Sequence, residues 1–331
     1  MSRYAAAHEK PAGPGDARPT AMQVVIDEAR EGSMKDKVIL VTGCSSGIGI
    51  DTARAVAATG ARVVLAVRSL EKGQETCGSF LEPGRVELLQ LDTSSLASVR
   101  EAAASFLERS STLNILICNA GIMLVPQREI SVDGFESQLA TNYLGHFLLF
   151  WLLKDAMLKA STPGFNSRLV NVSSSGHHAS EIQFDDLNLA KDGAYDPTKA
   201  YGQSKLAQIY MANYVDRHYG PKGLHALSLM PGGIRTNLQK HIPSEVKETW
   251  ETNKQIASFM KSTEQGAATT LVAAVSKEWE GKGGKYLEDC HIADFITQGN
   301  GASGVMPYAY DEAKEDRLWK LTLDVLGLEE D

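Results

Sequence analysis

Tyr201 and Lys205 stand four residues apart in the segment Tyr201-Gly202-Gln203-Ser204-Lys205. On a helix, this spacing places both side chains on one face, one turn apart. A phenol with an ordinary pKa of about 10 is a poor acid–base group at neutral pH, but a neighbouring ammonium stabilises its phenolate. The pair favours proton transfer by Tyr201, assisted by Lys205. Many tyrosines four residues from a lysine are only surface neighbours, so the interpretation needs further groups.

Polar residues follow two predicted strands. Ser173-Ser174-Ser175 comes directly after the strand Leu169–Val172, and Asn119-Ala120-Gly121 follows an earlier strand. Asn142 lies in the next predicted helix. Open parallel sheets bind ligands at the carboxyl ends of their strands, where a hydroxyl can hold a carbonyl oxygen and the alkoxide that develops from it. We therefore expect these residues to meet at one edge of a sheet.

A glycine-rich turn, Thr42-Gly43-Cys44-Ser45-Ser46-Gly47-Ile48-Gly49, joins a buried strand to a helix. Gly43 permits the tight turn, Gly47 lets the backbone approach a pyrophosphate, and Gly49 allows close packing of helix and strand. The helix N-terminus offers free N–H groups to the anion. The strand–turn–helix context predicts a dinucleotide site. The alternative is a glycine-rich turn without a ligand.

The second strand ends in Val67-Arg68-Ser69. An NAD-binding unit places an acidic side chain about 20 residues after the glycines, to bind the ribose 2′-hydroxyl. Val67 occupies the expected position, and the guanidinium of Arg68 can pair with a 2′-phosphate. Ser45 and Ser46 can add hydroxyl contacts. The pattern predicts NADP(H), with a solvated surface charge as the alternative for Arg68.

Strands and helices alternate along most of the chain, which predicts an α/β fold with a doubly wound parallel sheet. A single domain over residues 34–331 is expected, preceded by an N-terminal arm over residues 1–33 that is flexible up to residue 18 and then forms a short helix, Pro19–Arg30. A short strand is expected after Gly281–Tyr286 and a charged helix over 309–331. The other strands are expected at Ile39–Val41, Arg62–Val67, Val86–Leu91, Leu113–Cys118, Leu169–Val172 and His225–Met230, and the other helices at Ser46–Ala58, Leu96–Leu107, Val132–Lys159 and Ala200–Tyr219.

Composition narrows the class of protein. The chain has 331 residues, of which 43% are hydrophobic and 22% are charged, the balance of a globular protein with a core. Its formal charge of −8 argues against a nucleic-acid or anionic-membrane partner. The four cysteines are far apart, and the first thirty residues are polar, so a reducing, cytoplasmic location is expected. The longest apolar stretch, Tyr143–Leu153, is too short to span a membrane.

Six motifs in this order resemble the short-chain dehydrogenase/reductase family, over about residues 36 to 300. They are Thr42–Gly49, Asn119–Gly121, Asn142, Ser174, the Tyr201/Lys205 pair and Pro231-Gly232. The resemblance implies that Tyr201 is the general acid/base, that Lys205 lowers its pKa and binds the nicotinamide ribose, and that Ser174 polarises the substrate oxygen. It also implies that Asn142 holds a water in a proton relay to Lys205. Asp92 would bind adenine, and Ile234 and Thr236 would contact the carboxamide.

The long interval between Ser174 and Tyr201 resembles the retinol dehydrogenase and protochlorophyllide reductase branch, which favours NADP(H). The arm and the segment Gly283-Gly284-Lys285-Tyr286 resemble fungal members, several of which serve secondary-metabolite pathways. Two departures concern structural positions: Cys44 stands where alanine is usual, and Cys118 stands where many members have the first asparagine of Asn-Asn-Ala-Gly. The resemblance implies a homodimer in which the helices bearing Tyr143–Leu153 and Tyr201 pair across a two-fold axis.

Residues 237–261 stand where the family carries its substrate loop. Their apolar residues indicate either a lid over a bulky hydrophobic carbonyl or alcohol substrate, or an ordinary amphipathic helix packed on the body. No metal site is expected, and His177 and His178 are interpreted as loop residues at the pocket rim. The absence of a Gly-x-Ser-x-Gly turn around Ser174 excludes a serine hydrolase of that type. A non-catalytic NADP(H)-binding sensor on the same fold remains the alternative function.

Overall fold

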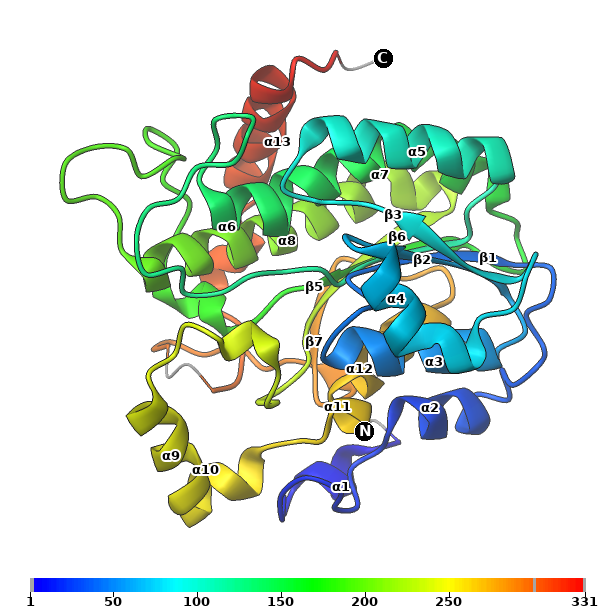
Figure 1. Ribbon diagram of the computed structural model, residues 1–331, viewed down its shortest axis with the longest axis horizontal. Coiled ribbons are helices and arrows are strands. Elements are labelled where there is room, and N and C mark those ends of the chain that lie inside the picture. Colours follow the sequence, from blue (N-terminus) through cyan, green and yellow to red (C-terminus); the bar gives the residue numbers. More distant parts are fainter. Residues whose placement is uncertain (1–2, 300–301, 330–331) are drawn as a thin grey trace.

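The computed structural model describes residues 3–299 and 302–329, and it contains one eight-stranded sheet in the order β3-β2-β1-β4-β5-β6-β7-β8 (Figure 1). All neighbours pair in parallel except β7 and β8, which are antiparallel. The predicted doubly wound α/β fold is confirmed. The strands are β1 Val38–Thr42, β2 Arg62–Val67, β3 Val86–Gln90, β4 Ile115–Cys118, β5 Ser167–Val172, β6 Leu224–Met230, β7 Lys285–Glu288 and β8 His291–Ile292.

The strand register brings the carboxyl ends of four central strands to one edge. Cys118 of β4 pairs with Asn171 of β5, and Val172 pairs with Leu229 of β6. The turns that follow β1, β4, β5 and β6 therefore begin side by side. These turns carry the glycine loop, Asn119, Ser174 and Pro231.

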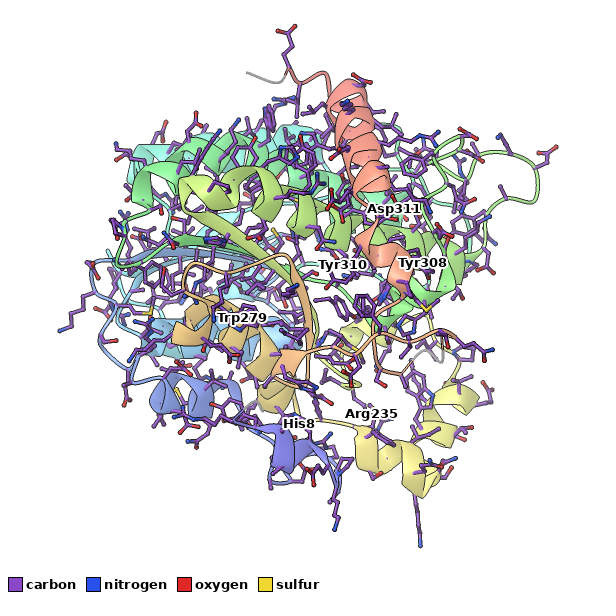
Figure 2. The ribbon with its side chains drawn as sticks, turned by 180° about the vertical axis from the view of Figure 1, so that it is seen from behind. His8, Arg235, Trp279, Tyr308, Tyr310 and Asp311 are labelled. Atoms are coloured by element: carbon purple, nitrogen blue, oxygen red, sulfur yellow. The ribbon has the colours of Figure 1, made fainter. Side chains whose placement is uncertain are left out.

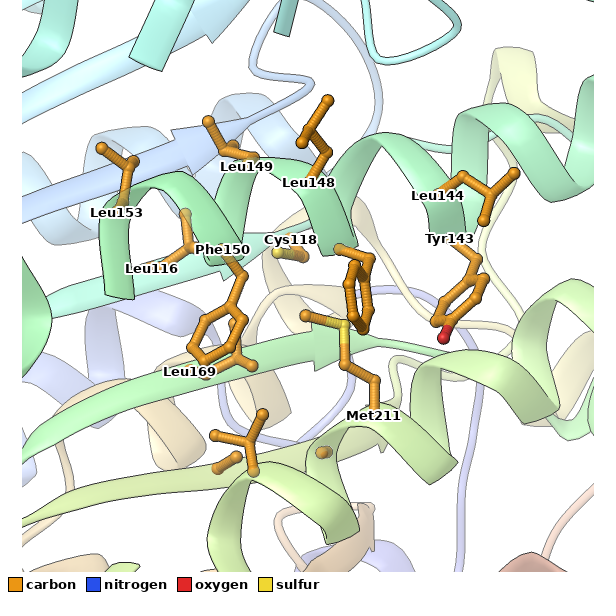
Figure 3. Close-up of a cluster of buried hydrophobic side chains, with 14 of the residues drawn as sticks. Leu116, Cys118, Tyr143, Leu144, Leu148, Leu149, Phe150, Leu153, Leu169 and Met211 are labelled. Carbon is orange, nitrogen blue, oxygen red and sulfur yellow. The ribbon is translucent and has the colours of Figure 1, made fainter. Parts of the chain in front are cut away.

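Helices cover both faces of the sheet (Figure 1). On one face, α5, α7 and α8 enclose an apolar core with β4 and β5, part of which is drawn in Figure 3. On the other face, α2, α3 and α12 enclose a second core. The α-helices are α1 Ala5–His8, α2 Ala21–Asp27, α3 Ile48–Ala58, α4 Leu70–Cys77, α5 Leu96–Arg109, α6 Ser137–Leu139, α7 Gly145–Ala160, α8 Pro197–Tyr219, α9 Ser244–Thr252, α10 Lys254–Phe259, α11 Thr263–Gly266, α12 Ala268–Val275 and α13 Glu312–Leu326.

The helix predicted over Val132–Lys159 begins later and is interrupted. Residues 130–136 form a tight turn instead, and the Glu136 carboxylate caps α6 by accepting from the N–H groups of Gln138 and Leu139. A π-helical turn, Ala140–Leu144, then joins α6 to α7 and contains Asn142. Such turns occur frequently at functional sites. The prediction was wrong here because a side-chain cap and a π turn leave no clear mark in hydrophobic periodicity.

The C-terminal helix α13 packs on the outer face of α7 and α8. Its Trp319 is buried, with ring centroids 4.7 Å from Phe147 of α7 and 3.9 Å from Tyr214 of α8. Tyr308 and Tyr310 lie in the segment that leads into this helix (Figure 2). The helix face expected to pair in a homodimer is therefore covered by the chain's own C-terminus.

The N-terminal arm is packed rather than loose. Arg18 is 4% exposed, and its guanidinium donates to backbone carbonyls at the end of α10, about 240 residues later. The prediction of a flexible stretch up to residue 18 was wrong, because composition shows the prolines and glycines but not the distant carbonyls that hold them. The short helix expected after the arm is α2.

Candidate active site

A cavity of about 570 Å³ opens at the carboxyl ends of β1, β4, β5 and β6. It brings together all the predicted site residues except Asn142. The glycine loop lines one end, Arg68 and Asp92 line the side beyond β2, and Ser174, Tyr201 and Lys205 line the other end. The predicted residues that line it are Gly43, Ser45, Ser46, Gly47, Ile48, Gly49, Arg68, Asp92, Asn119, Ala120, Gly121, Ser174, Tyr201, Lys205, Pro231, Gly232, Ile234 and Thr236.

The glycine loop has the shape that a pyrophosphate site needs. Gly43 has φ +75°, and a Cβ there would lie 2.7 Å from Ala120 Cα. A Cβ at Gly49 would lie 2.1 Å from the Gly43 carbonyl oxygen, so helix α3 could not pack this closely with any other residue. The loop leads directly into the N-terminus of α3, where free N–H groups favour an anion. The cradle therefore fits a dinucleotide.

Asn119 and Thr42 hold the loop against β4. The Asn119 amide donates to the carbonyls of Thr42 (2.9 Å) and Gly43 (3.3 Å), and the Thr42 hydroxyl accepts from the N–H groups of Asn119 and Ala120. The Asn119 Oδ1 atom is buried without a hydrogen-bond partner in the described structure. Asn119 thus braces the loop through its amide nitrogen and leaves an acceptor beside the cavity.

A buried histidine extends this bracing to α7. His146 Nε2 lies 2.9 Å from the Thr42 hydroxyl, and its Nδ1 lies 2.9 Å from the Asn142 carbonyl. Burial lowers the pKa of His146 to about 4, so the ring is neutral at pH 7. This contact could not be predicted from the sequence, because nothing in the local pattern places His146 against a residue about a hundred positions earlier.

Two cations face the cavity beyond β2. Arg68 and Lys72 both line it and both are exposed. Lys72 lies in the first turn of α4, a helix that was not predicted. Val67 does not line the cavity. Its side chain is buried against Gly73 of α4, whereas Ala66 and Arg68 on either side of it line the cavity. Neither is acidic.

Tyr201 and Ser174 lie together at the end of the cavity opposite the glycine loop. The Tyr201 hydroxyl is hydrogen-bonded to Ser174, whose hydroxyl also accepts from the Gly176 N–H at 3.0 Å. A Cβ at Gly176 would lie 2.5 Å from the Tyr201 ring, so the glycine lets the ring pack on the loop. Burial raises the pKa of Tyr201 to about 12, although the hydrogen bond with Ser174 opposes the rise. The phenol is therefore a proton donor in this state.

Lys205 is buried on the same helix, with Nζ 5.7 Å from the Tyr201 ring centroid. Its Nζ donates to the Val172 carbonyl (2.8 Å) and to Gln208 Oε1 (2.9 Å). Burial lowers the pKa of Lys205 to about 7, so the ammonium exchanges its proton near neutrality. Gln208 was not among the predicted site residues, although its position three residues after Lys205 on a helix could have indicated the contact.

Asn142 does not line the cavity but lies behind the residues that do. Its side chain accepts from the Ile122 N–H (2.8 Å) and donates to the Ile122 carbonyl (3.0 Å) and to the Ser204 hydroxyl (2.9 Å). A Cβ on Gly121 would lie 3.2 Å from Asn142 Oδ1 and 3.6 Å from Lys205 Nζ. Asn142 therefore fixes the turn after β4 beside Lys205. The proton relay through Asn142 stays a prediction.

The interpretation of His177 as a rim residue was wrong. Its ring is fully buried, with Nδ1 2.7 Å from the Ser174 carbonyl and a centroid 5.1 Å from the ring of Tyr286. Burial lowers its pKa to about 4. His177 thus braces the segment that carries Ser174. Across residues 3–299 and 302–329, no group of three histidine, cysteine, aspartate or glutamate side chains is arranged to hold a metal ion.

Only the first part of segment 237–261 reaches the cavity, through Asn237, Leu238, Gln239 and Lys240. Helices α9 and α10 project from the body (Figure 1). Neither buries a side chain among the residues described, and Phe259 is 60% exposed. The packed amphipathic helix considered above is therefore not what forms here.

Comparisons with known proteins agree with this geometry. The family model described as short chain dehydrogenase matches residues 37–247. The chain is 54% identical over 329 residues to short-chain dehydrogenase/reductase prx1 of Penicillium roqueforti, covering 99% of this chain and 96% of that one. It is 37% identical to human retinol dehydrogenase 11, covering 88% and 86%.

A crystal structure of an uncharacterised protein from Mycobacterium paratuberculosis superposes with a TM-score of 0.69 at 31% identity. The match covers 95% of this chain and 99% of that one. In the described part of the chain, no helix is long and apolar enough to cross a membrane.

Proposed function

Because the chain belongs to the short-chain dehydrogenase/reductase family, we propose that it is an NADP(H)-dependent oxidoreductase that reduces the carbonyl of a hydrophobic small molecule or oxidises the corresponding alcohol. One observation carries the proposal. Ser174, Tyr201 and Lys205 line the same cavity as the glycine loop, and the Tyr201 hydroxyl is hydrogen-bonded to Ser174. A protein that only senses the cofactor would not need these three groups together.

The chain's own groups supply the proton. When bound, the reduced nicotinamide provides the hydride. Ser174 holds the carbonyl oxygen of the substrate, and the Tyr201 hydroxyl donates its proton to that oxygen as negative charge develops. The phenolate left behind is favoured by the positive charge of Lys205 on the same helix. Lys205 would also hold the nicotinamide ribose, and Asn142 would keep the neighbouring turn in place.

The preference for NADP(H) rests on charge at the far end of the cavity. Arg68 and Lys72 both face it, and a 2′-phosphate can pair with both, whereas neither Ala66 nor Arg68 can accept from a 2′-hydroxyl as an acid would. Asp92 would contact the adenine and Ile234 and Thr236 the carboxamide.

The substrate class rests on the apolar residues of segment 237–261 and on a relative named for retinol, a hydrophobic alcohol. The similarity to a Penicillium relative supports a place in fungal secondary metabolism. A cytoplasmic location stays a prediction from the polar N-terminal sequence. A homodimer also stays a prediction, and it would need a surface other than the one α13 covers.

A substrate screen tests the proposal. Purified protein is incubated with NADPH and a panel of hydrophobic ketones, aldehydes and quinones, and cofactor oxidation is followed by absorbance. NADH is run in parallel, and the Tyr201→Phe variant serves as the blank. We expect oxidation of NADPH with at least one hydrophobic carbonyl. Tight NADPH binding without turnover on any member of the panel would support the sensor instead.

A further inference from the structure

Segment 237–261 is held at both ends, and the two helices in its middle lie on the surface. At its start, a capping box joins Thr236 and Gln239, and the Gln239 amide donates to the Ile234 carbonyl. In the middle, α9 and α10 bury no described side chain. A segment with few buried apolar contacts between two anchored ends opens at low free energy. How its second end is anchored therefore decides how it moves.

The second end is held by the N-terminal arm. The Arg18 guanidinium donates to the carbonyls of Phe259 (2.9 Å) and Met260 (2.6 Å), the last of α10 and the residue after it. Asp16 accepts from Arg18 Nε at 2.9 Å. Burial opposes ionisation of Asp16, but its hydrogen bonds from Arg18 and from the N–H groups of Ala12 and Arg18 keep the pKa of this carboxyl well below its usual range. The arm thus presents a paired, buried cation to the negative end of a helix.

A buried glutamine fastens the arm to the next helix. Gln265 in α11 donates from Nε2 to the backbone and side chain of Asp16 and to the Arg18 carbonyl, at 3.0 to 3.2 Å. Its Oε1 accepts from the N–H groups of Gly15 (2.9 Å) and Ser262 (3.0 Å). One side chain therefore connects the arm to the residues that follow the segment.

Lys261 connects the same end to the cavity. Its buried Nζ donates to Asp289 Oδ1 (2.6 Å) and to the Pro231 carbonyl (3.2 Å), and its backbone N–H donates to the Gly233 carbonyl (2.8 Å). Gly232 has φ +112°, and a Cβ there would lie 2.8 Å from the Lys261 side chain. From the arm side, His8 lies 3.7 Å from Asp289 (Figure 2 shows His8). The arm, the segment end and the Pro231-Gly232 turn form one network.

We propose that residues 13–18 are an anchor that fixes the second hinge of segment 237–261, so that the segment closes over a bound carbonyl substrate from a set position, and that Arg18 is a positioning residue for that substrate. The inference rests on the proposed function for the identity of the substrate. It does not require Arg18 to touch the substrate or the cofactor. A purely structural arm would affect folding alone.

The test compares Arg18→Met with Arg3→Met. Arg3 lies on the same arm but is exposed, and it bonds to α2 rather than to α10. Trypsin can cut after Lys247 and Lys254, in α9 and α10. We expect Arg18→Met to speed cleavage at these two sites by about tenfold or more, since it removes hydrogen bonds from a charged group. Arg3→Met should cleave at the wild-type rate.

Steady-state kinetics give the second readout. We expect Arg18→Met to raise KM for the carbonyl by roughly threefold or more, with kcat and the Kd for NADPH within about twofold of wild type. Arg18→Lys keeps the positive charge but lacks the planar guanidinium with its several donors. Its cleavage rate and KM should therefore lie between those of wild type and Arg18→Met. Unchanged cleavage and unchanged KM in Arg18→Met would overturn the proposal, as would equal losses of kcat and NADPH affinity.

Two further outcomes keep the test decisive. If Arg18→Met does not fold, Asp16→Asn is used, which weakens the same anchor while keeping the guanidinium, and a wild-type cleavage rate in that variant would count against the anchor. If the wild type turns over no carbonyl, the proposed function fails. The trypsin comparison still applies in that case, and faster cleavage in Arg18→Met alone would support the anchor independently.

Discussion

Helix α8, which carries residues of the cavity, and helices α9 and α10, which follow the cavity-lining residues 237–240, are built in opposite ways. In α8, 17 of 23 residues are buried, including Tyr201 and Lys205. Across α9 and α10, none of the described residues is buried. The groups proposed to transfer the proton are therefore held by close packing, which fixes their separation and shifts their pKa values. The segment that carries α9 and α10 is anchored near its two ends and leaves both helices on the surface, so it can adapt to the shape of a substrate.

This difference predicts that substitutions in α8 change the rate of the chemistry or the stability, whereas substitutions in the segment change substrate affinity.

The largest effect is expected for Tyr201→Phe, which keeps the ring and removes the hydroxyl. We expect kcat to fall by roughly 10²–10⁴, the usual contribution of a positioned acid–base group. Folding and NADPH binding should be retained, because the ring still packs on Gly176. Turnover and NADPH affinity are measured with any accepted carbonyl. If more than about a tenth of wild-type turnover remained, the proton would have to come from another group.

The packing contrast itself is tested by truncating one apolar side chain in each region. Leu206→Ala in α8 should lower the free energy of unfolding by about 2–5 kcal/mol, because it leaves a cavity in the core. Phe259→Ala at the exposed end of α10 should change it by no more than about 0.5 kcal/mol. Urea denaturation gives both values. Similar losses in the two variants would show that α10 packs as tightly as α8.

Arg68→Ala should weaken NADPH binding by about 1.5–3 kcal/mol, the range for a hydrogen bond to a charged group. NADH binding should change little, since it lacks the 2′-phosphate. Titration calorimetry on wild type and variant measures both affinities, and Lys72→Ala serves as the companion variant in the same cavity. Equal affinity of the wild type for the two cofactors would contradict the preference.

The smallest effect concerns the pH profile. Gln208→Glu places a carboxylate where Lys205 Nζ now meets an amide oxygen. The added negative charge raises the pKa of Lys205 above about 7, while the neutral ring of His146 nearby adds no charge. Proton donation by Tyr201 leaves a phenolate that the Lys205 ammonium stabilises, so the alkaline limb of kcat, where that ammonium is lost, should move up by about one pH unit. An alkaline limb that did not move, or that moved to lower pH, would show that residue 208 does not act on the pH profile through Lys205.

Much of the site could be predicted from the sequence because its signals are local. The glycines of the loop, Ser174 after β5 and the Tyr201/Lys205 pair each sit at a strand end or on one helix face, and parallel strands bring such ends together. The relation of these elements to the cavity therefore follows from the fold class alone.

The rest depends on contacts between distant residues. Arg18 donates to the Met260 carbonyl 242 positions later, and His146 of α7 contacts the Thr42 hydroxyl at the end of β1. Lys72 was missed because α4 is short and polar. The local periodicity of the sequence predicts neither the backbone carbonyls that accept from the buried Arg18 guanidinium nor the π-helical turn that contains Asn142.

The position of α13 has a practical consequence for handling the protein. It covers an aromatic stripe formed by Phe147, Phe150 and Tyr214, with Trp319 inserted among them. A polypeptide shortened at residue 311 would present that stripe to water, and such patches promote self-association and precipitation. An affinity tag on the C-terminus therefore needs a spacer long enough to leave α13 packed on α7 and α8.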